Sequence, residues 1–196
     1  MTFTTGHALV IGIGLGIVIG SIRWLRSTLE PVLEFLRAIP PPVLVPVVVL
    51  FAGIHDTMKV IVILAGCVWP VLLNTVEGVR GADEVLVDTG RSYRIGGWLR
   101  LRKLVLPGAA PQIFTGARQS LAIAIILMVI SEMFYADSGM GHTIVEAGRE
   151  FNYSLVWSGV LLLGLLGVLL SLLFWLVESR ALRWYYGFRA AERRSR

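Results

Sequence analysis

Few side chains in this sequence of 196 residues have the types and spacing needed for covalent or metal chemistry. The three histidines, His7, His55 and His142, lie in different segments, and no HExxH or Cys/His spacing accompanies them. The single cysteine, Cys67, excludes an intramolecular disulfide. His142 and Glu146 are four residues apart, and we interpret them as a solvent-side polar pair. We therefore expect the chain to bind no metal and no cofactor and to have no catalytic residue of its own.

A glycine-rich run near the start suggests packing rather than phosphate binding. A phosphate loop follows a strand and turns its backbone N–H groups toward a ligand, whereas this run lies inside an apolar segment. Gly12, Gly16 and Gly20 recur at every fourth position. This spacing predicts a stripe of small residues that lets two membrane helices approach closely.

The composition favours an integral membrane protein. The chain is 56% hydrophobic and 16% charged, with a mean hydropathy of +0.75. A soluble domain has about 25% charged residues, and a monomer of this size cannot bury so much apolar surface. We predict an all-α membrane protein with about five transmembrane helices, in one domain over residues 1–196. The apolar runs lie at residues 8–22, 41–54, 60–76, 116–134 and 155–177. The second run is short, and its helix could begin in 32–39 and bend at Pro40–Pro42.

The basic residues predict how the chain is oriented in the membrane. If the first span runs inward, sixteen of the eighteen Lys and Arg residues lie on the inner side and only Lys59 and Arg149 lie outside. Positive loops stay on the cytoplasmic side, so we expect an outer amino terminus and a cytoplasmic carboxyl terminus. The net charge of +5 then reflects the orientation of the chain in the membrane, and we expect no nucleic-acid partner. Arg118, near the end of a span, is expected to extend toward water. The inner set is Arg23, Arg26, Arg37, Arg80, Arg91, Arg94, Arg100, Arg102, Lys103, Arg118, Arg180, Arg183, Arg189, Arg193, Arg194 and Arg196.

Residues 78–111 form a long inner connection that is predicted to fold into a compact knob. A first short helix over 83–93 begins with Asp83 and Glu84, which suit a helix N-terminus. Gly96 and Gly97 are expected to break it. An amphipathic helix with Trp98, Leu101, Leu104 and Val105 on one face would follow and end at Pro107 and Pro111. From the residues alone, contact with lipid and docking of a protein partner are equally favoured.

Within this connection, the segment from Asp88 to Pro107 resembles the EAA loop of ABC importer permeases. The family pattern is Glu-Ala-Ala, three residues, Gly, nine residues, Ile, one residue and Leu-Pro. Here the spacing is kept, with nine residues between Arg94 and Leu104, and Leu106-Pro107 match. Asp88, Thr89 and Gly90 replace the Glu and the two Ala, Arg94 replaces the Gly, and Leu104 replaces the Ile. Segments 34–41, 74–80, 131–133, 137–141 and 182–184 resemble the nitrate/sulfonate/taurine branch of that family.

The resemblance implies a permease of the bacterial cytoplasmic membrane that imports a small oxoanion or organic sulfonate. It implies a homodimer or pair of permeases, a cytoplasmic ATPase dimer that binds ATP and Mg, and an external substrate-binding protein. Glu132 is expected either to gate the path or to touch lipid headgroups. The alternative function is a membrane anchor or assembly protein without transport. The residues implied to dock on the ATPase are Asp83, Glu84, Asp88, Thr89, Gly90, Arg91, Ser92, Tyr93, Arg94, Gly96, Gly97, Leu106 and Pro107.

Two features depart from the family pattern. Members usually carry one more span before the segment at 8–22, so either the start is truncated or misassigned, or this is a five-span variant. Arg94 stands where the family has a glycine that allows a tight turn. We expect Gly96 and Gly97 to take over that turn.

Overall fold

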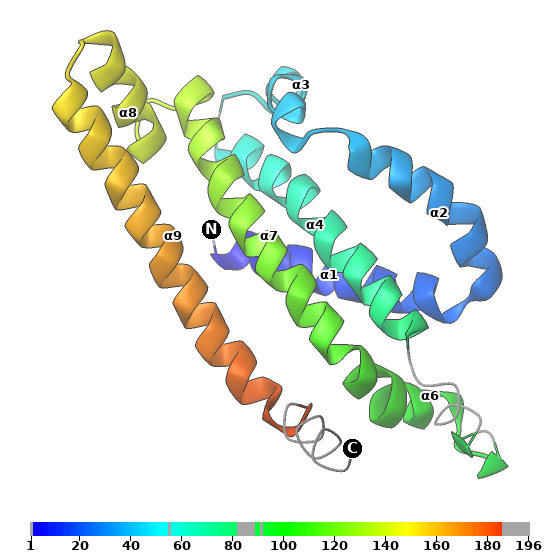
Figure 1. Cartoon of the computed structure of the whole chain (residues 1–196). Coiled ribbons are helices and arrows are strands. Elements are labelled where there is room, and N and C mark those ends of the chain that lie inside the picture. Colours follow the sequence, from blue (N-terminus) through cyan, green and yellow to red (C-terminus); the bar gives the residue numbers. More distant parts are fainter. Residues whose placement is uncertain (1, 55, 82–88, 91, 186–196) are drawn as a thin grey trace.

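The computed structural model describes residues 2–54, 56–81, 89–90 and 92–185, and every element in this part of the chain is helical (Figure 1). The elements are α1 (Thr2–Ser21), α2 (Arg23–Ala38), a 3₁₀ turn (Pro41–Val43), α3 (Leu44–Ala52), α4 (Asp56–Arg80), α6 (Gly97–Arg100), a π-helical turn (Leu101–Val105), α7 (Leu106–Tyr135), α8 (Met140–Arg149) and α9 (Tyr153–Ala181).

Four of the five predicted membrane helices are confirmed, and each of these four is longer than its apolar run. Within the described residues, four helices are long and apolar enough to cross a membrane, namely α1, α4, the helix from Gly97 to Tyr135, and α9. α9 has the highest mean hydropathy of the four, 2.8 over its best window. A bent pair, α2 with the segment Pro41–Ala52, passes the same test of length and hydropathy only when its two parts, which meet at 72°, are taken together, so the described residues hold four spans, or five when the pair is counted as one.

The break between α2 and α3 follows from three consecutive prolines. Pro40, Pro41 and Pro42 cannot donate backbone hydrogen bonds, so α2 ends at Ala38 and the chain restarts in a 3₁₀ turn. Arg26 and Arg37, which the charge count assigned to the inner side of the membrane, lie on α2. This helix packs against α1 and α4 through a ridge of leucines, Leu25, Leu29 and Leu33.

The core is a three-helix layer in which α4 lies between α1 and α7. α1 and α4 run parallel, because Gly12, Gly16 and Gly20 lie against Val71, Thr75 and Val79 in that order. α4 and α7 run antiparallel, with Gly66 beside Leu127 near one end and Gly78 beside Gln112 near the other. The glycine stripe expected from the sequence therefore lies at the α1–α4 contact, where side chains would keep the backbones apart.

α9 stands apart from this core and is joined to it near its two ends (Figure 1). Near its start, Gly159 packs against Ile144 of α8. Near its end, Phe114 and Phe174 have ring centroids 6.2 Å apart, and Arg118 of α7 forms an ion pair with Glu178. Arg118 therefore has a protein partner, whereas the sequence predicted only an extension toward water.

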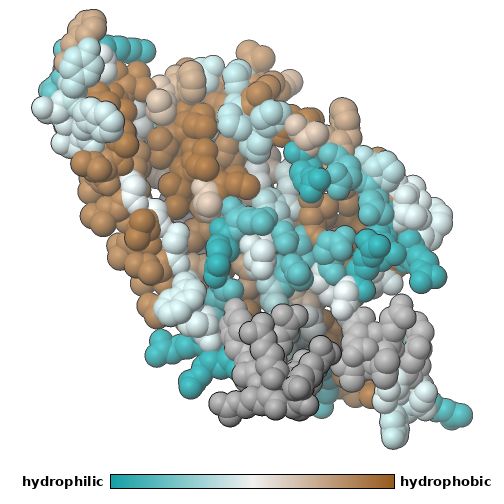
Figure 2. All heavy atoms as spheres, viewed as in Figure 1, coloured by the Kyte–Doolittle hydropathy of each residue, from teal (hydrophilic) through white to brown (hydrophobic). Residues whose placement is uncertain are grey.

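Cations of the long connection and of the helix termini gather at one end of the bundle, which we call the basic end. α1 and α4 finish there and the helix of α6 starts there (Figure 1). Figure 2 shows apolar surface along α9 and polar surface over α2 and toward this end. The opposite end carries the α3–α4, α7–α8 and α8–α9 connections. Described cations at the basic end include Arg23, Arg80, Arg94, Arg100, Arg102, Lys103 and Arg180.

Proline positions in the second half correct one expectation. Pro107 and Pro111 do not end a helix, because the chain is helical from Gly97 through Tyr135. A π-helical turn makes this continuity feasible, since the N–H of Leu106 donates to the carbonyl of Leu101, five residues back. Pro107, which has no N–H, follows this π-helical turn directly as the second residue of α7.

Candidate functional site

The candidate docking residues divide into those that the structure describes and those that it does not. Asp83, Glu84, Asp88 and Arg91 lie outside the described residues. The remaining nine lie together at the basic end, beside or on the start of the helix that leads into α7. They are Thr89, Gly90, Ser92, Tyr93, Arg94, Gly96, Gly97, Leu106 and Pro107.

The turn that joins the two parts of the knob is made by Arg94 itself. The N–H of Tyr93 donates to the carbonyl of Thr89 at 3.0 Å, and the N–H of Ile95 donates to that of Gly90 at 2.9 Å. Arg94 has a φ of 53°, the left-handed region that favours glycine. Gly96 has a φ of −55°. The expectation that Gly96 and Gly97 replace the missing glycine is therefore wrong, because Arg94 adopts the strained conformation directly.

Gly90 is buried inside the knob. A Cβ atom built on it would lie 2.9 Å from Cδ1 of Leu104 and within 4 Å of the Arg100 side chain. Gly90 leaves room for the chain's own Leu104, so this part of the knob is held against the helix that enters α7.

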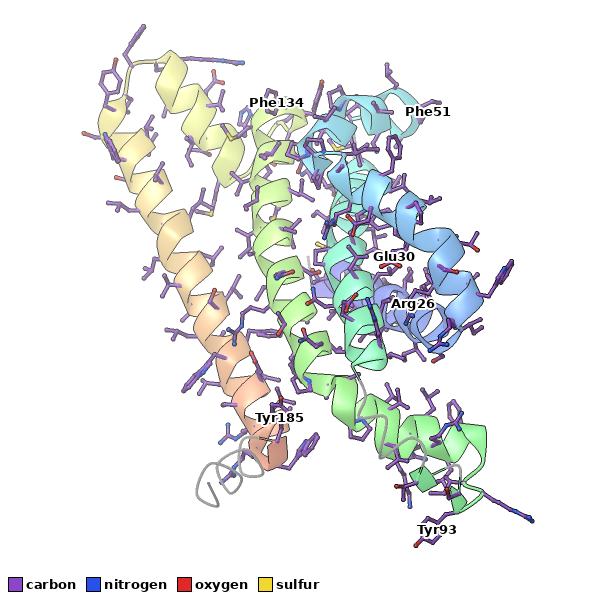
Figure 3. The ribbon with its side chains drawn as sticks, turned by 45° about the vertical axis from the view of Figure 1, so that its right-hand side comes forward. Arg26, Glu30, Phe51, Tyr93, Phe134 and Tyr185 are labelled. Atoms are coloured by element: carbon purple, nitrogen blue, oxygen red, sulfur yellow. The ribbon has the colours of Figure 1, made fainter. Side chains whose placement is uncertain are left out.

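The outward side of the knob carries aromatic and basic side chains. Tyr93 is 79% exposed and lies at the tip (Figure 3), and Trp98 is 74% exposed. Arg94 is also exposed. Sequence reasoning placed Trp98 on the face shared with Leu101, Leu104 and Val105 and did not propose it for docking. Large exposed aromatic groups beside a cation are typical of protein interfaces.

A second polar region lies between α2 and α4, toward the ends of α1 and α4 at the basic end. A recess of about 110 Å³ opens there, and Figure 3 shows Arg26 and Glu30 on the side of α2 that faces α4. Sequence analysis did not identify this site, because Arg26 and Glu30 lie between the apolar runs, in a part of the chain that was expected to be a connection. The residues that line the recess are Ile19, Arg26, Glu30, Leu33, Glu34, Arg37, Leu73, Val76 and Glu77.

Some of the charges around the recess already have partners. Arg37 pairs with Glu34 at 2.7 Å, and Arg80 pairs with Glu77 at 3.4 Å. Within the described part of the chain, neither Arg26 nor Glu30 belongs to an ion pair. These two residues are four positions apart on one helix and so share a face.

An amide pair follows along α4, one turn before Glu77. Asn74 donates from Nδ2 to the carbonyl of Pro70 at 2.8 Å and to Oε1 of Gln119 on α7 at 3.2 Å. The first bond is local and joins the Asn74 side chain to the carbonyl one turn earlier on α4. The second joins α4 to α7 by polar groups within their membrane-spanning length.

Glu132 of α7 lies buried at the start of α8. It is 6% exposed, and its Oε2 accepts a hydrogen bond from the N–H of Gly141 at 3.0 Å. Gly139, with a φ of 124°, lies against the same carboxylate, which a side chain at that position would displace. Because Gly139 and Gly141 form the start of α8, Glu132 places a negative charge at a helix N-terminus that lacks a capping side chain of its own.

Cys67 and Ser120, whose side chains could in principle react, lie at the contact between α4 and α7. Cys67 donates from Sγ to the carbonyl of Ser120 at 3.3 Å, and Ser120 donates from Oγ to the carbonyl of Cys67 at 2.5 Å. This reciprocal pair ties α4 to α7. Among the residues that the structure describes, no group of three His, Cys, Asp or Glu side chains is arranged to hold a metal ion.

The comparisons with known proteins agree with this architecture. Residues 10–183 match the family model described as binding-protein-dependent transport system inner membrane component. A protein named as an aliphatic sulfonates transport permease of Bacillus subtilis is 31% identical over 179 residues, which is 89% of this chain and 65% of that protein. A taurine transport system permease protein of Escherichia coli is 29% identical over 91% of this chain and 65% of its own length. A bicarbonate transport system permease protein of Synechococcus elongatus is 33% identical over 84% of this chain and 59% of its own length.

A solved structure supports the fold. A chain of the MetNI methionine ABC transporter in an inward facing conformation superimposes with a TM-score of 0.75 at 18% identity, covering 93% of this chain and 89% of that one. The chain spans less than two thirds of the length of the curated relatives named above. Because the family model covers most of the sequence, the chain belongs to the family of binding-protein-dependent transport system inner membrane components.

Proposed function

We propose that this chain is a permease subunit of an ATP-driven importer and that it works as a pair with a second permease. Its membership of the binding-protein-dependent family carries the proposal. The partners are an ATPase dimer, which binds ATP and Mg and performs the hydrolysis, and an external substrate-binding protein. The names of the relatives, which mention sulfonates, taurine and bicarbonate, support a small oxoanion or organic sulfonate as the solute.

The basic end faces the cytoplasm in this proposal. The described basic residues of the knob and of the helix termini at this end then lie inside, as insertion into a bacterial cytoplasmic membrane favours. The first described helix starts outside and the last one ends inside. At the opposite end, a depression of about 230 Å³ lined by Asp56, Lys59, Tyr135, Asp137 and Ser138 faces the external binding protein.

The knob at 83–107 docks on the ATPase. Its exposed Tyr93, Arg94 and Trp98 supply the contact, and the packing of Gly90 on Leu104 keeps the contact surface fixed relative to the helix. Because the chain is helical without a break from Gly97 to Tyr135, a displacement of the knob moves α7 as a rigid lever. Transport then requires two states of the permease pair that nucleotide and binding protein favour differently.

Purification of the native complex tests the proposal. The chain is extracted in mild detergent with an affinity tag, and we expect an ATPase subunit to purify with it in a two-to-two complex. Charge reversal by Arg94→Glu should leave insertion intact and should uncouple ATP hydrolysis from uptake. Gly90→Trp is unsuitable for this purpose, since it would disrupt the knob itself.

A non-transporting anchor is the competing function. The exposed Trp98 and Leu99 stand beside Arg100, Arg102 and Lys103, a combination that also suits a helix lying on anionic lipid. A chain that purifies alone, and whose knob is protected by lipid rather than by protein, would support the anchor and contradict the importer.

A further inference from the structure

α7 carries a row of polar side chains on a side that its neighbouring helices leave uncovered. Gln112, Thr115 and Gln119 are spaced by three and four residues, so they share one face of the helix, and all three are exposed. The contact with α4 lies on a second side, at Gly116, and the contact with α9 lies on a third side, at Arg118. We call Gln112, Thr115 and Gln119 the polar stripe.

The polar surface continues from α7 onto α4. Asn74, whose side chain donates to Gln119 at 3.2 Å, is followed one turn later by Glu77. The ion pair of Glu77 with Arg80 leaves both side chains more than half exposed, at 58% and 52%. In Figure 2, polar surface extends from α2 across α4 and α7 toward the basic end. The polar stripe is therefore part of a wider polar face of α4 and α7.

The deepest members of this face lie within the membrane-spanning part of their helices. Asn74 and Gln119 belong to helices that are long and apolar enough to cross a membrane, and they stand inside the apolar runs at 60–76 and 116–134. Gln112 packs beside Gly78, near the last residue of α4. At the rise of an α-helix, Gln119 lies about 10 Å deeper than Gln112. The polar stripe thus runs from the basic end into the hydrocarbon region.

Lipid is an unfavourable neighbour for this face. Among the described residues, Asn74 is the only hydrogen-bond partner of the Gln119 side chain, and the Gln112 side chain has none. An amide without a partner is costly in hydrocarbon, and polar side chains in membrane helices face a protein partner or a water-filled cavity instead. A dry contact with a second permease is also unfavourable, because it would bury the exposed carboxylate of Glu77. Water is the remaining neighbour.

We propose that the polar face of α4 and α7 lines a water-filled path through the inner half of the membrane, along which the solute moves. The carbonyl oxygen of Gln119 already accepts a hydrogen bond from Asn74. The two N–H groups of Gln119 are therefore the donors that the polar stripe offers at its deepest level. The inference rests on the proposed importer function and assigns the side of the chain that its path follows.

Reaction of single cysteines with a charged thiol reagent tests this assignment. Gln112→Cys, Thr115→Cys and Gln119→Cys are made separately in a Cys67→Ala background. Inverted membrane vesicles that contain the full complex are treated with 2-(trimethylammonium)ethyl methanethiosulfonate, with and without ATP. Only the thiolate reacts, and it forms more readily in water than in an apolar environment. The unreacted fraction is then labelled with a fluorescent maleimide in denaturant, which gives the rate at each position.

The matched control is Leu173→Cys on α9. Leu173 is 51% exposed and precedes Phe174, whose ring meets that of Phe114 on α7, so the control lies at a similar depth on an apolar helix. We expect each of the three cysteines in the polar stripe to react at least about tenfold faster than the control in one of the two conditions. A difference of one unit in thiol pKa between water and lipid is enough for this ratio.

Two results would overturn the assignment. Rates at the polar stripe that match the control, with and without ATP, would show that the stripe faces lipid. Slow reaction together with an oxidative disulfide between two copies of Gln119→Cys would show that it faces a second permease. Gln112→Cys and Thr115→Cys keep the hydrogen bond between Asn74 and Gln119, so they test the path even if Gln119→Cys does not assemble. The proposed function fails separately, when no ATPase purifies with the chain.

Discussion

Gly16 of α1 and Thr75 of α4 touch so closely that a Cβ atom built on the glycine would lie 2.6 Å from Cβ of the threonine. The carbonyl of Leu72 would lie 2.9 Å from the same atom. Thr75 is fully buried and donates to the carbonyl of Val71 at 2.6 Å. This contact fixes the distance between two parallel helices, and any side chain at position 16 must push them apart.

Gly16→Ala should therefore destabilise the protein, by about 1–3 kcal/mol as for other overpacked sites. Gly14 on the same helix offers a matched control, because nothing lies within 4 Å of a Cβ built there. Gly14→Ala should be neutral or stabilising, by up to about 1 kcal/mol, since alanine is the better helix former. The thermal unfolding midpoints of the two variants in detergent measure the difference, and equal midpoints would contradict the packing described here.

Glu132→Ala should loosen α8. The substitution removes the acceptor of the buried Gly141 N–H and the negative charge at the start of the helix. We expect a loss of about 1–3 kcal/mol, and a smaller loss for Glu132→Gln, which keeps an acceptor oxygen. Hydrogen exchange over residues 139–149 is the direct measurement. Glu146→Ala, which removes an exposed partner of Arg149, serves as the control and should change little.

The ion pair of Arg118 and Glu178 should show an asymmetry between single and double substitution. Arg118→Leu leaves the buried Glu178 carboxylate without its partner and should cost about 1–3 kcal/mol. Arg118→Leu combined with Glu178→Leu removes both charges and should be milder than the single change. The unfolding midpoints of the unaltered protein and of the two variants measure these differences in stability. A double variant less stable than Arg118→Leu alone would show that the pair does not hold α9 to α7 as proposed.

The membrane helices were predictable because their apolar runs exceed what a soluble chain of this size can bury. α2 was not, because Arg26, Glu30, Glu34 and Arg37 interrupt the hydropathy signal. Its leucine ridge at every fourth position was a signal of helical packing that the charges obscured. Among candidate site residues, the glycine stripe follows from spacing alone. The burial of Glu132 against α8 does not, because it joins residues of different helices through a turn whose geometry no local pattern specifies.

The turn at Arg94 gives a further prediction. A residue other than glycine in the left-handed region costs about 1–2 kcal/mol, so Arg94→Gly should tighten the knob by about 1 kcal/mol. Slower hydrogen exchange at the Ile95 N–H, which donates to Gly90, would report this gain. Tyr93→Gly is the matched change at the preceding residue, whose φ is not positive, and it should speed that exchange. Equal hydrogen-exchange rates at the Ile95 N–H in the two variants would contradict a left-handed turn at Arg94.

Site-specific cross-linking tests the central claim, that the knob at 83–107 docks on an ATPase. In a Cys67→Ala background, a single cysteine is placed at Tyr93, which is 79% exposed at the basic end, or at Tyr153, which is 63% exposed at the opposite end. In native membranes, the cysteine at 93 should cross-link to the ATPase subunit, with a yield that changes when ATP is added, and the cysteine at 153 should not. Cross-linking of position 93 to no other protein, or labelling of that position from the outer side of the membrane, would contradict the account.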